Sequence, residues 1–203
     1  MHRLIVNCAV LAAFALGTSI SVAQQAAPDV VVKTATAEVL GLLKQPKDAD
    51  PLHASKLDAL VESRIVPLFH FRRMTEIAVG PSWSQATPDQ RNALTAEFRT
   101  LLLRTYAAAL RAFEDQTITF KPIDVAPEAV DATVQSVVSD GDASRMPIDY
   151  YMEKTADGWK VYEISIDGMK LIQNYRGTFT ARVRDRGLDG LIKVLADRNR
   201  QSD

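Results

Sequence analysis

The chain has 203 residues, of which 47% are hydrophobic and 24% are charged, and its formal net charge at pH 7 is −1. This length suits one well-buried domain, and this composition excludes a disordered or collagen-like chain. The near balance of acidic and basic residues predicts no binding to nucleic acid or to an anionic membrane surface.

The first residues differ in composition from the rest of the chain. A short basic start is followed by an apolar run over residues 4–17 and by small residues at Ser21 and Ala23. The apolar run is too short to span a membrane, so residues 1–23 are predicted to be a secretory signal peptide that is cleaved after Ala23. We therefore expect a periplasmic protein that consists of one domain over residues 24–203 and does not insert stably into a membrane.

Residues that carry enzyme or metal chemistry are scarce in the predicted mature chain. The single cysteine, Cys8, lies in the signal peptide, which excludes disulfides and thiolate chemistry after cleavage. The two remaining histidines, His53 and His70, have no second ligand at helical or hairpin spacing, so we expect no metal. Nucleophile motifs and glycine-rich phosphate loops are also missing, so we expect no enzyme activity and no cofactor.

The first half of the chain predicts helices. Apolar residues recur at helical spacing over residues 29–43, 55–66, 72–79 and 88–113. The last of these is the best defined, because Thr87 can cap the helix and a proline follows at its first position.

The chain then changes to a period of two, which predicts strands. Alternating apolar residues indicate four strands, near residues 118–120, 130–138, 146–152 and 159–166. The pairs Asp140-Gly141 and Asp157-Gly158 are typical of hairpin turns, so we expect an antiparallel meander.

A turn at Asp167 and Gly168 leads directly into a last helical region, interrupted at Gly187 and ending near Arg198. The whole pattern predicts an α+β fold with N-terminal helices, a four-stranded antiparallel sheet and C-terminal helices on one face of that sheet. A packed core and an apolar pocket between sheet and helices would have the same sequence pattern.

Two stretches resemble the MlaC/Ttg2D family, the periplasmic phospholipid-binding components of toluene-tolerance and lipid-asymmetry transporters. The C-terminal stretch has Trp159, Tyr162, Asp167, Gly168, Asn174, Tyr175, Arg176, Phe179 and Gly187. The second stretch has Pro67, Phe69, Phe71, Met74, Gly80, Trp83, Thr87, Gln90, Arg91, Phe98, Leu102 and Tyr106. The chain departs from the family pattern at His70, where an aspartate is usual, and at Met169 and Lys170, where a small residue and a serine are common.

The resemblance implies that the apolar interior is a pocket for phospholipid. The residues that would then bind lipid are Phe71, Phe98, Leu102, Tyr106, Ile148, Tyr150, Met152, Tyr162, Ile164, Leu171, Tyr175 and Phe179. It also implies a monomeric carrier whose partners are an outer-membrane lipoprotein complex and an inner-membrane ABC transporter with an MCE-domain subunit.

Three alternatives stay open at this point. The cargo would be another apolar lipid, such as a hopanoid, in related transport systems. A small cone-shaped α+β enzyme, such as an isomerase, would need a buried acid or histidine facing the pocket. An adaptor without a ligand would have a solid core in place of the pocket.

Overall fold

The computed structural model describes residues 25–44, 53–111, 116–140 and 144–201. The predicted signal peptide over residues 1–23 lies outside these ranges, and so do Gly141 of the first predicted hairpin turn and the predicted helix end at Phe113. None of the helices in the described ranges combines the length and the apolar character needed to cross a membrane.

The order of elements agrees with the predicted α+β fold. The helices are α1 (Pro28–Leu43), α2 (His53–Leu60), the π-helix η2 (Val61–Ile65), the 3₁₀-helices η3 (Val66–Leu68) and η4 (Gly80–Gln85), α3 (Phe71–Val79), α4 (Pro88–Arg111) and α5 (Leu171–Gln201). The strands are β1 (Thr117–Phe120), β2 (Asp131–Asp140), β3 (Ser144–Thr155), β4 (Gly158–Ile166) and β5 (Met169–Lys170).

The helix predicted over residues 55–66 is divided in the structure. After α2, the N–H of Val66 bonds to the carbonyl of Val61, five residues earlier, and a 3₁₀ turn follows. Pro67 explains the change, because it has no N–H to donate and its ring would clash with the carbonyl four residues before it. The helix therefore widens to a π-helix and then tightens to a 3₁₀-helix to accommodate this proline.

The sheet is an antiparallel meander in the order β1-β2-β3-β4-β5, so it has five strands and not the predicted four. The additional strand, β5, has two residues and pairs with Ser165 and Ile166 across the turn at Asp167 and Gly168. A strand of two residues is too short to show alternation, so the sequence pattern could not reveal it.

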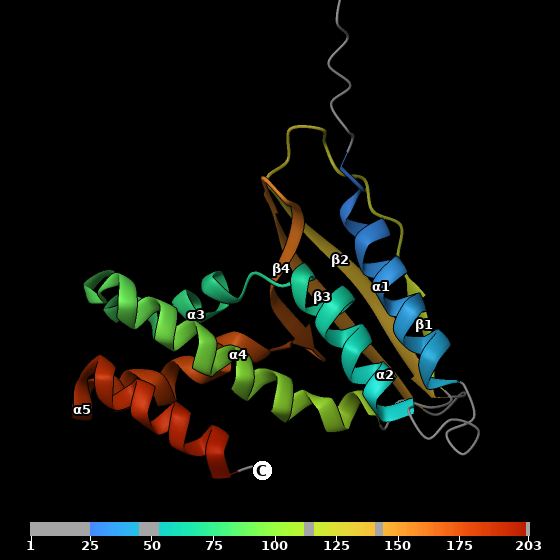
Figure 1. The fold of residues 1–203 in the computed structure, drawn as a ribbon. Coiled ribbons are helices and arrows are strands. Elements are labelled where there is room, and N and C mark those ends of the chain that lie inside the picture. The colour runs from blue at the N-terminus through green and yellow to red at the C-terminus, as the bar shows by residue number, and fades with distance from the viewer. Residues whose placement is uncertain (1–24, 45–52, 112–115, 141–143, 202–203) are drawn as a thin grey trace, which may run out of the picture.

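Figure 1 shows two lobes, which we call the sheet lobe (α1, α2, η2 and the strands) and the helical lobe (α3, η4, α4 and α5). In the sheet lobe, Val32 of α1 packs on Met152 and Trp159. At the start of α3, His70 joins the lobes: its N–H donates to the carbonyl of Val161 at 2.8 Å, and its Nδ1 pairs with Glu153 on β3.

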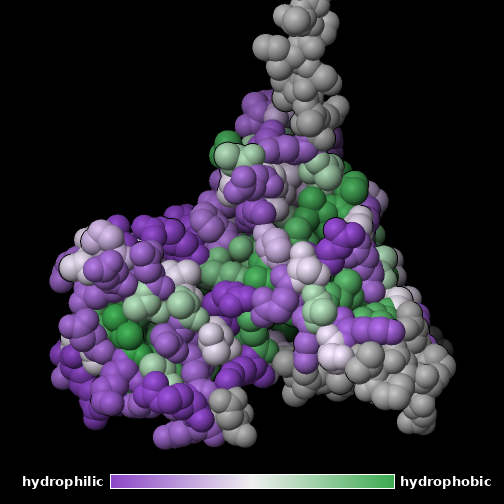
Figure 2. Space-filling view, in the orientation of Figure 1, coloured by the Kyte–Doolittle hydropathy of each residue, from purple (hydrophilic) through white to green (hydrophobic). Residues whose placement is uncertain are grey.

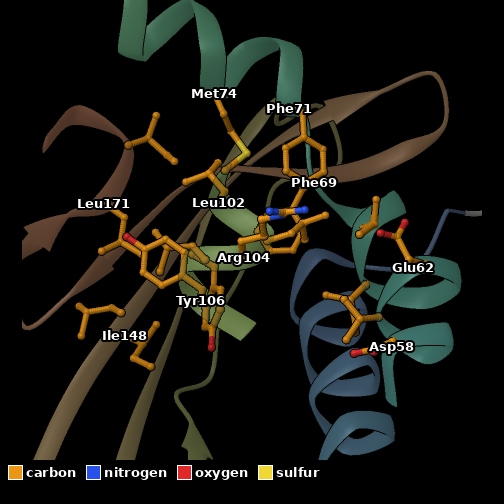
Figure 3. Close-up of a pocket in the computed structure, with 18 of the residues that line it drawn as sticks. Asp58, Glu62, Phe69, Phe71, Met74, Leu102, Arg104, Tyr106, Ile148 and Leu171 are labelled. Carbon is orange, nitrogen blue, oxygen red and sulfur yellow. The ribbon is translucent and has the colours of Figure 1, made fainter. Parts of the chain in front are cut away.

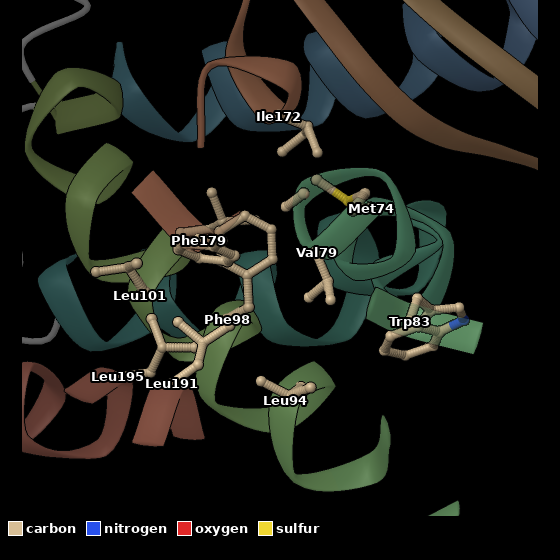
Figure 4. Close-up of a cluster of buried hydrophobic side chains, with 12 residues drawn as sticks. Met74, Val79, Trp83, Leu94, Phe98, Leu101, Ile172, Phe179, Leu191 and Leu195 are labelled. Atoms are coloured by element: carbon tan, nitrogen blue, oxygen red, sulfur yellow. The ribbon is translucent and has the colours of Figure 1, made fainter. Parts of the chain in front are cut away.

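The helical lobe has its own packed core, shown in Figure 4. Phe98 of α4 lies at its centre, with ring centroids 5.1 Å from Phe179 of α5. The predicted break at Gly187 is present, with φ of 69°, and the chain beyond it returns Leu191 and Leu195 to the same core. Both halves of α5 therefore pack against α4, which borders the space between the two lobes.

Candidate functional site

An open cavity of about 540 Å³ lies between the sheet and the helices. Figure 3 shows the side chains around it, and Figure 2 shows hydrophobic residues in the hollow between the lobes. The lining residues are Leu57, Asp58, Val61, Glu62, Ile65, Val66, Phe69, Phe71, Met74, Leu102, Leu103, Arg104, Tyr106, Ile148, Tyr150, Ile164, Ile166, Leu171 and Ile172. Its volume is in the range of sites that bind small molecules.

The sheet wall is built by strand register. Ile148 of β3 is opposite Ile166 of β4, and Tyr150 is opposite Ile164. Directly paired residues point to the same face of a sheet, so these four side chains form one apolar surface.

The wall opposite the sheet comes from α2 and η2. Leu57, Val61 and Ile65 recur every four residues and line the cavity. Leu57 also packs on Val39 and Leu43 of α1, in a cluster separate from the cores of the two lobes. This wall is therefore supported mainly by α1.

The remaining walls come from the helical lobe. Phe71 and Met74 extend from α3, and Phe69, which precedes this helix, has its ring centroid 5.8 Å from that of Phe71. Leu102 comes from α4, and Leu171 comes from the start of α5. Aromatic and methionine side chains can repack around apolar groups of different shapes.

The charged lining residues, Asp58, Glu62 and Arg104, are all exposed. Glu62 forms an ion pair with Arg99 of α4, which links η2 to the helical lobe. Arg104 donates a hydrogen bond to the carbonyl of Asn199 near the end of α5. Polar groups thus mark the solvent side of the cavity, and the apolar groups form its interior.

Two tyrosines inside the cavity stay neutral at physiological pH. Burial, and then the neighbouring Tyr175 and Glu163, raise the pKa of Tyr106 to about 12. Burial also raises the pKa of Tyr150, while its hydrogen bond to Ser136 opposes the shift. These hydroxyls therefore place no negative charge inside the cavity.

The buried acid nearest the site has a structural role. Glu163 of β4 is 2% exposed, and its carboxylate accepts hydrogen bonds from the backbone N–H groups of Ile164, Ile172 and Gln173. Two of these groups belong to the first turn of α5, where an acceptor is needed. Glu163 thereby fixes the helix start that places Leu171 and Ile172 in the lining. Its position in an alternating strand gave no sign of this role.

Seven of the twelve residues predicted to bind lipid lie in the cavity lining: Phe71, Leu102, Tyr106, Ile148, Tyr150, Ile164 and Leu171. Five lie outside it: Phe98, Met152, Tyr162, Tyr175 and Phe179. The prediction did not separate residues that fill the cores from residues that line the hollow.

The five predicted residues outside the lining lie in or against the cores of the two lobes, or beside Arg73. Phe98 and Phe179 belong to the core of the helical lobe, with Tyr175 packed against them, and Met152 is fully buried in the core of the sheet lobe. Tyr162 turns away because β4 has a bulge opposite Tyr151 and Met152, and its ring lies under Arg73 at 5.7 Å. A bulge reverses the alternation that the sequence suggested.

The largest group that sequence reasoning left out is the wall of α2 and η2, with Leu57, Val61 and Ile65. Their spacing of four residues was evident, but it indicated only a buried helix face. In the ranges that the structure covers, no three His, Cys, Asp or Glu side chains are grouped so that they could hold a metal.

Comparisons with known proteins agree with this geometry. The family model described as MlaC protein matches residues 33–197. The toluene tolerance protein ttg2D of Pseudomonas putida is 27% identical over 180 residues, covering 88% of this chain and 81% of that protein. A phospholipid-binding protein from Ralstonia solanacearum, solved in complex with a phospholipid, is 39% identical with a TM-score of 0.76, covering 87% of this chain and 99% of that chain.

Proposed function

The chain belongs to the MlaC family, and on this basis we propose that it is a carrier that shields the acyl chains of a phospholipid in the cavity between its lobes. The observation that carries the proposal is the lining, which is apolar in its interior and charged at exposed positions. A similar protein of 39% identity was solved with a phospholipid bound, which supports the same cargo here.

The physical reason for such a cavity is the cost of exposing acyl chains to water. Each methylene that leaves an apolar environment costs about 0.8 kcal/mol, so two free chains would cross an aqueous compartment extremely slowly. A cavity of about 540 Å³ lowers this cost by surrounding acyl methylenes with side chains such as Leu102, Ile148 and Ile164. The polar headgroup would remain near Asp58, Glu62 and Arg104.

A lipid-carrier function fits the arrangement of side chains in and near the cavity better than an enzyme activity does. The acids of the lining, Asp58 and Glu62, are exposed to solvent, and buried Glu163 is occupied by three backbone N–H groups. An enzyme of the isomerase type would need a buried acid or base that faces the cavity with a shifted pKa.

The transport route extends the proposal to partners. The carrier would shuttle phospholipid between an outer-membrane lipoprotein complex and an inner-membrane ABC transporter with an MCE-domain subunit, maintaining the lipid asymmetry of the outer membrane. It needs an affinity for lipid comparable to that of a membrane, because direction would come from partners that favour loading or release. Export by cleavage after Ala23 would give a periplasmic monomer of residues 24–203.

The test is mass spectrometry of lipid extracted from the protein after purification from its native periplasm without detergent. We expect glycerophospholipid in the extract. A hopanoid or other apolar lipid would keep the carrier role and change the cargo. Absence of any lipid, together with no uptake from phospholipid vesicles, would refute the carrier proposal.

A further inference from the structure

The near-zero net charge hides a strong separation of charge between parts of the chain. Residues 71–111 and 169–201, which contain the helical lobe and β5, have 14 arginines and lysines against six acids, a net charge of +8. The rest of the chain has 10 arginines and lysines against 19 acids, a net charge of −9. The two parts of the chain therefore carry opposite net charges, and association depends on such local fields.

Three arginines gather around η4 from three different helices, and we call them the η4 arginine cluster: Arg72 of α3, Arg91 of α4 and Arg176 of α5. The guanidinium carbons of Arg72 and Arg91 lie 5.6 and 5.4 Å from the ring centre of Trp83. Arg176 donates through Nε to the carbonyl of Ile77 at 3.1 Å. The cluster is thus assembled by tertiary folding and not by one run of sequence.

The backbone makes room for this arrangement at Gly80. Its φ is +69°, and a Cβ at that position would come within 3.2 Å of Nε of Arg176. Any other residue would be strained and would displace the guanidinium.

The partners that hold the cluster are neutral. Arg91 donates to the carbonyls of Trp83 and Ser84, both at 3.2 Å. Within the described residues, no carboxylate forms an ion pair with Arg72, Arg91 or Arg176. Neutral partners therefore hold the three guanidinium groups in place, and no ion pair from the described part of the chain neutralises them.

Arginine supplies most of the positive charge in the two basic ranges. Of the 14 cations in the two basic ranges, 12 are arginine, whereas seven of the 10 elsewhere are lysine. Arginine presents a planar fork that binds carboxylates in bidentate geometry, and it is enriched at protein interfaces. The same fork binds phosphate, so the choice of a protein over an anionic lipid rests on the apolar surface around the cluster.

The apolar surface argues for a protein partner. The large hydrophobic side chains that are exposed in the described residues are Val30, Val130, Met146 and Met169. None of them belongs to α3, η4, α4 or α5, so the cluster has no apolar anchor beside it for insertion into a bilayer. Figure 2 shows a mostly hydrophilic surface over the helical lobe.

We propose that the η4 arginine cluster is a docking surface for an acidic face of a partner protein. The proposal rests on the carrier function, since a carrier must meet proteins that load and unload it. Helix α3 connects the two sites, because Arg72 belongs to the cluster and Met74 lines the cavity. Contact at the cluster would thus be made on an element that also forms the lipid site.

The test compares two variants that change the charge equally. R72E/R176E reverses two exposed arginines of the cluster, and K121E/R145E reverses two exposed cations of the sheet lobe. Binding of each purified, lipid-loaded protein is measured by co-sedimentation with native envelope membranes, before and after protease treatment of the membranes. Vesicles of phosphatidylcholine, with or without phosphatidylglycerol, replace the membranes in parallel.

We expect binding to the envelope membranes to weaken with salt, to disappear after protease treatment and to fall about tenfold in R72E/R176E while K121E/R145E binds normally. A photo-crosslinker at exposed Gln85, beside the cluster, should capture a peptide rich in Asp and Glu. The proposal would be overturned if both variants lost binding equally, or if binding survived the protease treatment. It would also be overturned if the protein bound phosphatidylglycerol vesicles as strongly as envelope membranes, or if the crosslinker captured a second copy of this chain. Lipid content of every variant is measured separately, so failure of docking is distinguished from failure of the carrier function.

Discussion

The carboxylate of Glu163 on β4 accepts a hydrogen bond of 2.8 Å from the backbone N–H of Ile172 on α5. A second oxygen accepts from Gln173 at 3.0 Å. This buried acid connects the sheet lobe to the first turn of the helix that completes the cavity. A negative charge is favourable there, because the N–H groups of a helix start carry partial positive charge.

Replacing Glu163 should therefore loosen both the fold and the site. We expect E163Q to lower the free energy of unfolding by about 1–2 kcal/mol, because the amide weakens charge-assisted bonds and turns a donor toward backbone N–H groups. Urea unfolding measures the change. The exposed Glu128 provides a matched control, and E128Q should stay within about 0.5 kcal/mol of the wild-type value. Equal unfolding free energies for E163Q and E128Q would show that Glu163 does not have this structural role.

Filling the cavity should block cargo without unfolding the protein. Ile148 points into the cavity, whereas Val137 of β2 belongs to the opposite face of the same sheet. We expect I148W to transfer fluorescent phosphatidylcholine between vesicles at least tenfold more slowly than wild type, and V137W to transfer it normally. The unfolding free energy of I148W should change by only about 1 kcal/mol, because the hollow accommodates the larger ring. Normal transfer by I148W would mean that lipid binds elsewhere.

The link between η2 and α4 should control how readily lipid enters. Glu62 pairs with Arg99 across the rim of the cavity, whereas Glu38 pairs with Arg64 between α1 and η2. We expect E62Q to exchange bound lipid several times faster, because the wall of α2 and η2 loses its tie to the helical lobe. E38Q should leave exchange unchanged, and both variants should lose less than about 1 kcal/mol of stability, since exposed ion pairs contribute little. Stopped-flow fluorescence with a labelled phospholipid measures the rates, and identical rates in both variants would show that the Glu62 pair does not restrain this wall.

The raised pKa of Tyr106, one of the two tyrosines in the cavity, predicts a fall in stability at alkaline pH. The pKa of Tyr106 is about 12 in the folded protein, raised chiefly by burial, against 10 in an unfolded chain. The folded state therefore keeps the proton longer, so this contribution is complete below about pH 10 and is lost as the pH rises to about 12. Urea unfolding in this window should show a shallower decline for Y106F than for wild type. If the unfolding free energies of Y106F and wild type fell in parallel with pH, the assignment of this decline to Tyr106 would be contradicted.

Much of the fold could be predicted from the sequence because its signals are local. The capping residues before Pro88, the alternation in β2 to β4 and the break at Gly187 all depend on neighbours in the chain. The π-helix before Pro67 and the two-residue strand β5 were missed, because each depends on geometry that a short pattern does not encode.

The site was harder to predict because burial and cavity lining share one pattern. Phe98 and Leu102 are four residues apart on α4 and both belong to the core of the helical lobe, yet only Leu102 of these two also lines the cavity. Tyr162 left the predicted face because of a bulge, which alternation alone does not reveal. The sequence offered Arg72 and Arg176 as possible docking residues, but it did not reveal that they group with Arg91, since the three come from helices that meet only in the folded chain.

The most direct test of the central claim is photo-labelling by a phospholipid with a diazirine near the end of one acyl chain, followed by peptide mapping. We expect labels on the cavity walls, in residues 57–66 of α2, η2 and η3, 148–150 of β3 and 164–166 of β4, and we expect I148W to suppress them. Labels spread over the outer surface and unaffected by I148W would contradict the claim that acyl chains occupy the space between the lobes.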